Sequence, residues 1–168
     1  MEKDQTVAWT ELHLKQWKLH IAATPKGLCY VGSPGAPFKE LAKWISKRLP
    51  DYEVVEDEKT LEPYARELTE YLEGRRKDFS MKVDLYGTAF QQSVWEALLG
   101  IPFGETVTYS QMAERLQKPS AVRAVASAIG ANPVMIAVPC HRVIAKNGKL
   151  AGFRGGLEMK EKLLLLES

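Results

Sequence analysis

The sequence is poor in cysteine. Its 168 residues contain two, Cys29 and Cys140, which is too few for a disulfide framework. No apolar run is long enough to span a bilayer, and residues 1–6 lack the apolar core of a signal peptide. We therefore expect a cytoplasmic protein with no membrane partner, in which both cysteines remain thiols.

Metal-ligand and phosphate-binding patterns are also missing. His13, His20 and Cys29 match no closed zinc pattern and lack a fourth ligand, so we expect no metal and no cofactor. The glycine-rich stretch 151–156 lacks the flanking strand and the Gly-Lys-Ser/Thr sequence of a phosphate-binding loop. Charge of one sign is not in excess either, because the net charge is +2. Residues 87–168 hold nine basic and six acidic side chains, a modest surplus that is compatible with nucleic acid.

The remaining composition, 45% hydrophobic and 26% charged, is that of a globular protein, and we expect two domains, 1–86 and 87–168. In the first, residues 7–23 alternate like one or two strands and residues 28–32 like another, which predicts an antiparallel meander. Helical spacing covers 38–49 and 61–72. Residues 51–55 favour a short strand, and 79–85 an extended linker or last strand. Cys29 lies among apolar residues of a predicted strand, which favours a structural role.

The second half is mainly helical in pattern. Thr88 is a candidate N-cap for the helix that follows it. Two short helices come next, with Ser110 and Ser120 as candidate caps, and they form a candidate helix-turn-helix. Residues 143–150 read as a hairpin turned at 147–148, and residues 157–166 as a closing helix.

The second short helix, 121–129, carries small and apolar side chains except for Arg123. A major-groove reader needs polar side chains that reach base edges, which this helix lacks. Small side chains instead allow close approach to a narrow minor groove, with one long side chain as a probe. On the pattern alone, a plain core helix with an exposed arginine is the favoured interpretation.

A candidate nucleophile lies in the segment Pro139-Cys140-His141-Arg142-Val143. Basic neighbours favour loss of the thiol proton, and the thiolate is the nucleophile. The preceding residues, 132–138, read as a turn and a buried strand-like run that Pro139 stops. The alternative is a buried structural cysteine.

Taken together, these motifs resemble the O6-alkylguanine-DNA alkyltransferase family over residues 87–167. The resemblance rests on an ordered set: Phe90-Gln91, Val94-Trp95, Ile101-Pro102, Gly104, Thr108-Tyr109, Arg123-Ala124-Val125, Asn132-Pro133, Pro139 to Ile144, Gly148, Gly152-Phe153, Gly155-Gly156, Lys160, Leu163-Leu164 and Glu167. The first half resembles the family only in general pattern. The implied fold is α+β: a small N-terminal antiparallel sheet with helices, ribonuclease-H-like, then a mainly α, winged-helix-like domain with the helix-turn-helix.

The resemblance implies a monomer that acts once on double-stranded DNA, moving an alkyl group from O6-alkylguanine, or less well O4-alkylthymine, irreversibly to Cys140. His141 would draw the thiol proton through a water, and Glu167 would orient His141. Asn132 would brace the turn, Tyr109 would rotate the nucleotide and assist the leaving guanine, and Arg123 would fill the gap left by the flipped base. The implied DNA contacts are Arg123, Tyr109, Ser110, Ala121, Val122 and Arg142. The implied pocket residues are Met135, Val143, Ala151, Gly152, Phe153 and Arg154.

Elementary chemistry agrees with these roles. A thiol of pKa roughly 8.5 needs a base at neutral pH. A base atom inside stacked duplex DNA is reached only by flipping the nucleotide. The animal members' zinc site is not expected, because Thr24 and Cys29 stand at corresponding positions. Met135 stands where those members have proline, and Ala151 stands in place of a glycine, so the width of the pocket is left open.

Two other functions are compatible with parts of this pattern. A non-enzymatic lesion binder would carry tryptophan in place of Cys140. A cysteine hydrolase built on Cys140, His141 and Glu167 would turn over and would need an oxyanion hole.

Overall fold

The computed structural model describes residues 5–148 and 152–168, and the chain forms two compact units, Met1–Tyr86 and Gly87–Ser168. The predicted α+β class is confirmed, with a sheet and two helices in the first unit and mainly helices in the second. Within the described ranges, no helix has the length and apolar character needed to cross a membrane.

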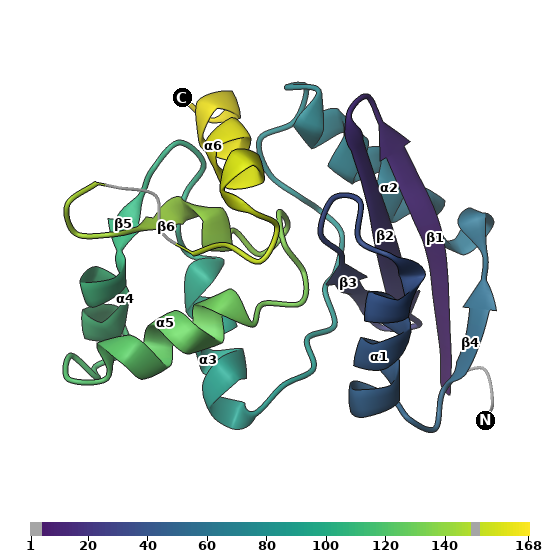
Figure 1. The fold of residues 1–168 in the computed structure, drawn as a ribbon, viewed down its shortest axis with the longest axis horizontal. Coiled ribbons are helices and arrows are strands. Elements are labelled where there is room, and N and C mark those ends of the chain that lie inside the picture. The colour runs from purple at the N-terminus through teal and green to yellow at the C-terminus, as the bar shows by residue number, and fades with distance from the viewer. Residues whose placement is uncertain (1–4, 149–151) are drawn as a thin grey trace. The chain divides into compact units, whose positions relative to one another are not determined.

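The first unit is built on a four-stranded sheet of order β3-β2-β1-β4 (Figure 1). Its strands are β1 (Thr6–Leu14), β2 (Trp17–Thr24), β3 (Gly27–Val31) and β4 (Glu53–Glu56). The predicted meander is present, since β1 pairs antiparallel with β2 and β2 with β3. The fourth strand runs parallel to β1, with Val7 opposite Val54, because the helix between β3 and β4 returns the chain in the same direction.

Two helices cover the two faces of this sheet, α1 (Phe38–Arg48) on one and α2 (Glu58–Leu72) on the other (Figure 1). Period-2 alternation divides each strand between the faces. Val7 and Ala22 pack with Leu41 and Ile45 of α1, and Cys29 lies in the same cluster. The apolar stripe of α2, which includes Leu61, Leu68 and Tyr71, is fully buried.

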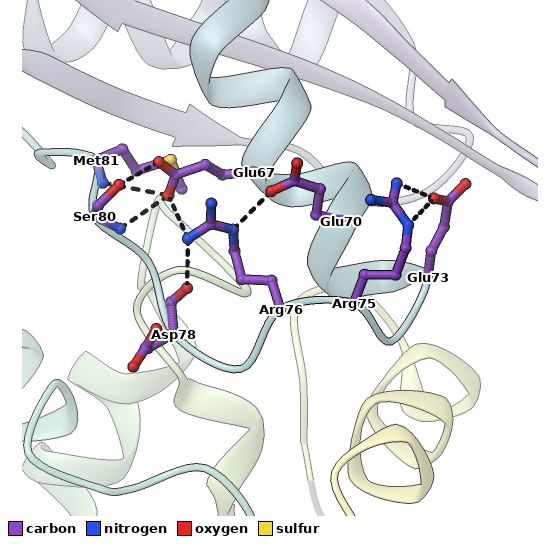
Figure 2. Close-up of polar contacts among 8 residues, drawn as sticks. All are labelled: Glu67, Glu70, Glu73, Arg75, Arg76, Asp78, Ser80 and Met81. Atoms are coloured by element: carbon purple, nitrogen blue, oxygen red, sulfur yellow. Dashed lines mark hydrogen bonds and ion pairs between the residues drawn. The ribbon is translucent and has the colours of Figure 1, made fainter.

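Residues 79–85, predicted as a strand or a linker, form a linker. This segment contains no regular strand but makes hydrogen bonds with the first unit. It makes one isolated bridge, Leu28 to Val83. Upstream, the buried carboxylate of Glu67 on α2 accepts hydrogen bonds from the backbone N–H of Ser80 at 2.9 Å, from the Ser80 hydroxyl, and from the N–H of Met81 at 3.3 Å. Arg76 lies between Glu67 and Glu70 (Figure 2). Glu67 is therefore the anchor for this segment.

The second unit contains α3 (Ala89–Leu98), α4 (Tyr109–Arg115), α5 (Val122–Gly130) and α6 (Leu157–Leu166), with two short strands, β5 (Val107–Thr108) and β6 (Val143–Ile144). The indole N–H of Trp95 on α3 donates to the carbonyl of Ala128 on α5 at 2.8 Å, which joins these two helices. The strands β5 and β6 pair in parallel. The turn expected at 147–148 is present, since the N–H of Gly148 donates to the carbonyl of Ala145 at 2.8 Å, but the returning arm of the expected hairpin lies largely outside the described residues.

Two of the three predicted helix caps in this unit need correction. Thr88 caps α3 as expected, in a reciprocal capping box with Gln91. The cap of α4 is Thr108 rather than Ser110, because Gln111 lies three residues after Thr108 and completes a second box. The helix α5 begins after Ala121 without a side-chain cap, so Ser120 does not serve there.

Candidate active site

A compact buried turn over residues 132–138 carries the chain to Cys140, where the sequence predicts a strand-like run. Asn132 determines its shape, because its side-chain Oδ1 accepts from the N–H of Val134 and its Nδ2 donates to the carbonyl of Val138, both at 2.9 Å. Ile136 adopts φ of 76°, a left-handed conformation that is strained for a β-branched residue. The predicted strand does not form, because the side-chain amide of Asn132 bonds to the backbone near both ends of this segment and holds it in a turn.

Cys140 opens a 3-10 helix, Cys140–Arg142, and only 4% of the residue is exposed. Its N–H donates to the Val138 carbonyl at 2.8 Å, the same oxygen that Asn132 binds. Burial raises the pKa of the Cys140 thiol, while a hydrogen bond with the Asn132 side chain and the positive charges of Arg154 and Lys160 act in the opposite direction. The thiol is consequently protonated at neutral pH and needs a base.

His141 and Glu167 form a buried pair, with Nε2 of His141 2.8 Å from Oε2 of Glu167. Burial lowers the pKa of His141, the charges of Arg142 and Lys160 lower it further, and Glu167 only partly compensates. His141 is therefore neutral at pH 7. Since a carboxylate can only accept, Nε2 carries the ring hydrogen and Nδ1 is the basic nitrogen.

Arg142 was predicted to contact DNA, which requires an exposed side chain. In the structure its side chain points inward. It is 7% exposed, and its guanidinium donates from Nε to Oε1 and from Nη2 to Oε2 of Glu167, both at 2.8 Å. Nη1 donates to the carbonyl of Ile101, and the group lies 5.8 Å from the ring centre of Phe103. The buried Glu167 carboxylate attracts the side chain inward, because an ionised group away from water needs a partner.

Lys160 is a site residue that the reasoning from the sequence left without a role. It lies on the inward side of α6, fully buried, with Nζ 5.9 Å from the ring centre of Tyr109. Burial lowers the pKa of Lys160, and a negative charge on Cys140 would act in the opposite direction. Burial also raises the pKa of Tyr109, as does Cys140. The signal in the sequence was a lysine between buried positions of α6, Met159 and Leu163.

The glycine-rich loop 152–156 lies against the same turn. Arg154 donates from Nε to the carbonyl of Asn132 at 3.1 Å and from Nη2 to that of Pro133 at 3.2 Å. A Cβ on Gly155 would lie 2.6 Å from Sδ of Met159, 2.7 Å from Cε2 of Phe153 and 3.2 Å from Sδ of Met135, so a larger residue would displace these side chains. Gly152 and Phe153 belong to this loop, whereas Ala151 lies outside the described residues. Val143, also expected in the pocket, is fully buried in β6.

The candidate DNA-contacting face of the helix-turn-helix lies on α4 and α5. Arg123, Ala124 and Ser127 of α5 are exposed, while Val125, Ala128 and Ile129 face the interior. Ser110, Ala121 and Val122 are half-buried at the starts of the two helices. The helix therefore has a buried apolar side, as expected of a core helix. It also has an outer side of small residues with one arginine, as expected of a helix that approaches the minor groove.

Cys29 is in a different setting from Cys140. It is fully buried in β3, and burial together with the nearby Asp84 raises the pKa of its thiol strongly. The Nε2 atoms of His13 and His20 lie 2.8 and 3.6 Å from carboxylate oxygens of Glu11. In the described ranges, no three His, Cys, Asp or Glu side chains are grouped as metal ligands would be.

Comparison with known proteins places the chain in a family. Residues 89–168 match the DNA binding domain of 6-O-methylguanine DNA methyltransferase, and residues 7–85 match its ribonuclease-like domain. The inducible methylated-DNA–protein-cysteine methyltransferase of Bacillus subtilis is 56% identical over 162 residues, which cover 96% of this chain and 90% of that protein. The chain belongs to the 6-O-methylguanine DNA methyltransferase family.

Solved methyltransferase structures have the same fold. The O6-methylguanine methyltransferase of Mycobacterium tuberculosis superposes with a TM-score of 0.82 at 34% identity, covering 96% of this chain and 93% of that one. The same bacterium's enzyme in complex with DNA gives a TM-score of 0.80 at 34% identity, with 95% and 92% covered. The resemblance inferred from the sequence is confirmed, and for this methyltransferase it extends over both units.

Proposed function

We propose that this methyltransferase repairs DNA by moving the alkyl group from O6 of guanine to Sγ of its own Cys140. The observation that carries the proposal is a buried thiol on the same 3-10 helix as a neutral histidine that is bonded to Glu167. The names of the relatives, methylated-DNA–protein-cysteine methyltransferase, and a neighbour solved with DNA support the reaction and the partner.

The proposed reaction begins with transfer of the Cys140 proton to Nδ1 of His141 through a bridging water. Neighbouring side chains on a 3-10 helix diverge by about 120°, which favours such an indirect path. Sγ then attacks the alkyl carbon, so the S–C bond forms, the C–O6 bond breaks and the electron pair stays on guanine. The Tyr109 hydroxyl assists the leaving base. Because a thioether is a poor leaving group, each molecule reacts once.

Access to the lesion requires a flipped nucleotide, because the alkyl group is enclosed in stacked duplex DNA. We assign the outer side of α5 to the minor groove, with Arg123 in the gap left by the base and with Ser110, Ala121 and Val122 against the backbone. Met135, Val143, Gly152, Phe153 and Arg154 line the base pocket in this proposal. Guanine lesions are the main substrate and O4-alkylthymine a lesser one. The acting species is a monomer.

A labelled-methyl experiment tests the proposal. The protein is incubated with duplex DNA that carries radiolabelled O6-methylguanine, and the label is located by peptide mass spectrometry. We expect a single methyl per molecule, on Cys140, no transfer by C140A and normal transfer by C29A. Label on Cys29, or repeated turnover by purified protein, would overturn the assignment, and tight lesion binding without transfer would favour a non-enzymatic binder.

A further inference from the structure

Arg154 joins two segments that both surround Cys140. Its guanidinium donates to the carbonyls of Asn132 and Pro133, at 3.1 and 3.2 Å, across 22 and 21 positions of the chain. Those carbonyls begin the turn that ends at Cys140. The glycine-rich loop is therefore held on the turn by the side chain of Arg154, in addition to any role of its backbone.

Hydrogen bonds within the turn connect Asn132 directly to Cys140. The Val138 carbonyl accepts from Nδ2 of Asn132 at 2.9 Å and from the N–H of Cys140 at 2.8 Å. The Asn132 side chain also forms a hydrogen bond with the Cys140 thiol. Arg154 thus binds the backbone of a residue whose side chain is in contact with the nucleophile.

Three titratable or charged groups act electrostatically on the thiol, each from a different element: Lys160 from α6, Tyr109 from α4 and Arg154 from the loop. His141 follows Cys140 on the 3-10 helix, where neighbouring side chains diverge. Of the three groups, Lys160 and Arg154 bring positive charge that favours the thiolate. Lys160 is fully buried on a helix, whereas Arg154 is half-buried on the loop and donates hydrogen bonds to the two carbonyls of the turn.

We propose that Arg154 is a positioning residue that docks the glycine-rich loop on the Asn132 turn and thereby keeps a positive charge near the Cys140 thiolate. The proposal rests on the proposed function and deepens it, because the loop that lines the base pocket then also contributes to activation of the nucleophile. The chemical step is unchanged: the thiol proton still leaves toward His141, and Arg154 neither gives nor takes a proton.

The test compares R154Q, which removes the charge, with R154K, which keeps the charge but loses the two-carbonyl fork. Iodoacetamide is the probe, and its reaction at Cys140 is followed from pH 6 to pH 10 by peptide mass spectrometry on the full chain. This reaction needs neither DNA nor an alkylguanine. A failure of the proposed function would appear only in methyl transfer, and a failure of the present proposal only in the pH profile.

For R154Q we expect the midpoint of the pH–rate profile at Cys140 to rise by about one unit, which is roughly a tenfold loss of thiolate at neutral pH. For R154K we expect a midpoint between those of the wild type and R154Q, because the charge remains but the two carbonyl bonds no longer hold it near the thiolate. R115Q is the matched control, since Arg115 is exposed on α4 and its loss changes net charge equally. We expect R115Q to keep the wild-type midpoint.

An unchanged midpoint in R154Q would overturn the proposal and leave Arg154 a purely structural role, as would an equal shift in R115Q. Thermal unfolding of each variant shows whether it folds. If R154Q does not fold, R154K decides, because a raised midpoint with the charge retained supports the proposal and a wild-type midpoint contradicts it.

Discussion

Arg142 holds the carboxylate of Glu167 by two parallel hydrogen bonds of 2.8 Å, and both side chains are buried. Oε2 of the same carboxylate lies 2.8 Å from Nε2 of His141. Glu167 is therefore shared between an arginine that neutralises it and a histidine that it orients. Burial is the main cause of the lowered pKa of His141, and the positive charge of Arg142 adds to it, although a carboxylate is in contact with the ring.

Replacing Arg142 by glutamine should destabilise the fold and move the pH profile of repair. Breaking a buried ion pair on one side costs about 3–5 kcal/mol, because Glu167 would remain buried with less compensation. The pKa of His141 should rise, so the loss of activity on the acid side should begin at a higher pH than in the wild type. Denaturant unfolding and single-turnover rates from pH 5 to pH 8 measure both effects. Wild-type stability with weakened DNA binding would instead mean that Arg142 does face DNA.

His141→Gln and Glu167→Gln should slow alkyl transfer through the same step. Removal of a general base costs roughly 10²–10⁴-fold, and the partner that orients it acts through it. The double variant should therefore be scarcely slower than H141Q alone, a non-additivity expected of residues that act as a unit. Single-turnover transfer to Cys140 measures this. Fully multiplicative losses would show that Glu167 has a role apart from His141.

Arg123→Ala should slow repair in duplex DNA far more than reaction with the free base O6-benzylguanine. Flipping costs a few kcal/mol and a free base needs no flipping, so we expect roughly a tenfold or larger loss on duplex and less than about twofold on the free base. R115A, which removes another exposed arginine of the helix-turn-helix, is the matched control. Equal losses on both substrates would mean that Arg123 supports the fold or the thiol. Binding of the wild type should weaken with added salt and show little sequence preference.

Glu67→Gln should weaken the first unit in a pH-dependent way. Burial alone would raise the pKa of Glu67, but hydrogen bonds from Ser80 and Met81 and the charge of Arg76 lower it below 4.5 overall. Because the folded pKa is lowered, this stabilisation is present above pH 4.5 and is lost as the pH falls through the folded pKa. We expect E67Q to lose about 1–3 kcal/mol at pH 7.

The control for this prediction is E62Q, on the exposed side of α2, where Glu62 pairs with Arg66 at 3.4 Å. Such an exposed pair contributes little, so E62Q should unfold at nearly the wild-type denaturant concentration. The difference between E67Q and the wild type should shrink below pH 4, measured by urea unfolding across pH. A constant difference would contradict the role of the ionised carboxylate in Figure 2.

Local patterns were enough to predict most of the secondary structure. The alternation through β1 and β2, the spacing of α1 and α2, and Thr88 at the start of α3 are properties of neighbouring residues, and the structure has them where they were expected. The family was also readable from the sequence, because the ordered motifs around Cys140 are specific and the comparisons confirm the membership.

The errors occurred where a distant partner decides the outcome. β6 pairs with β5 more than thirty residues away, and β4 joins β1 in parallel. The apolar residues 134–138 have strand-like composition, yet the amide of Asn132 satisfies the backbone at both ends of the segment and makes a turn. Local propensity predicts neither these strand pairings nor this turn.

The sequence by itself determined the family, and it predicted Cys140 as the nucleophile with His141 beside it, since the two residues are adjacent and embedded in a specific motif. Only the tertiary structure decided what surrounds them. Arg142 reads as a basic surface residue and Lys160 as a helix residue, but folding buries both beside the site. Arg142 is buried where the carboxylate of Glu167 compensates its charge, whereas burial lowers the pKa of Lys160 and only a Cys140 thiolate would raise it. That compensation depends on distances between residues far apart in the chain, which no stretch of sequence specifies alone.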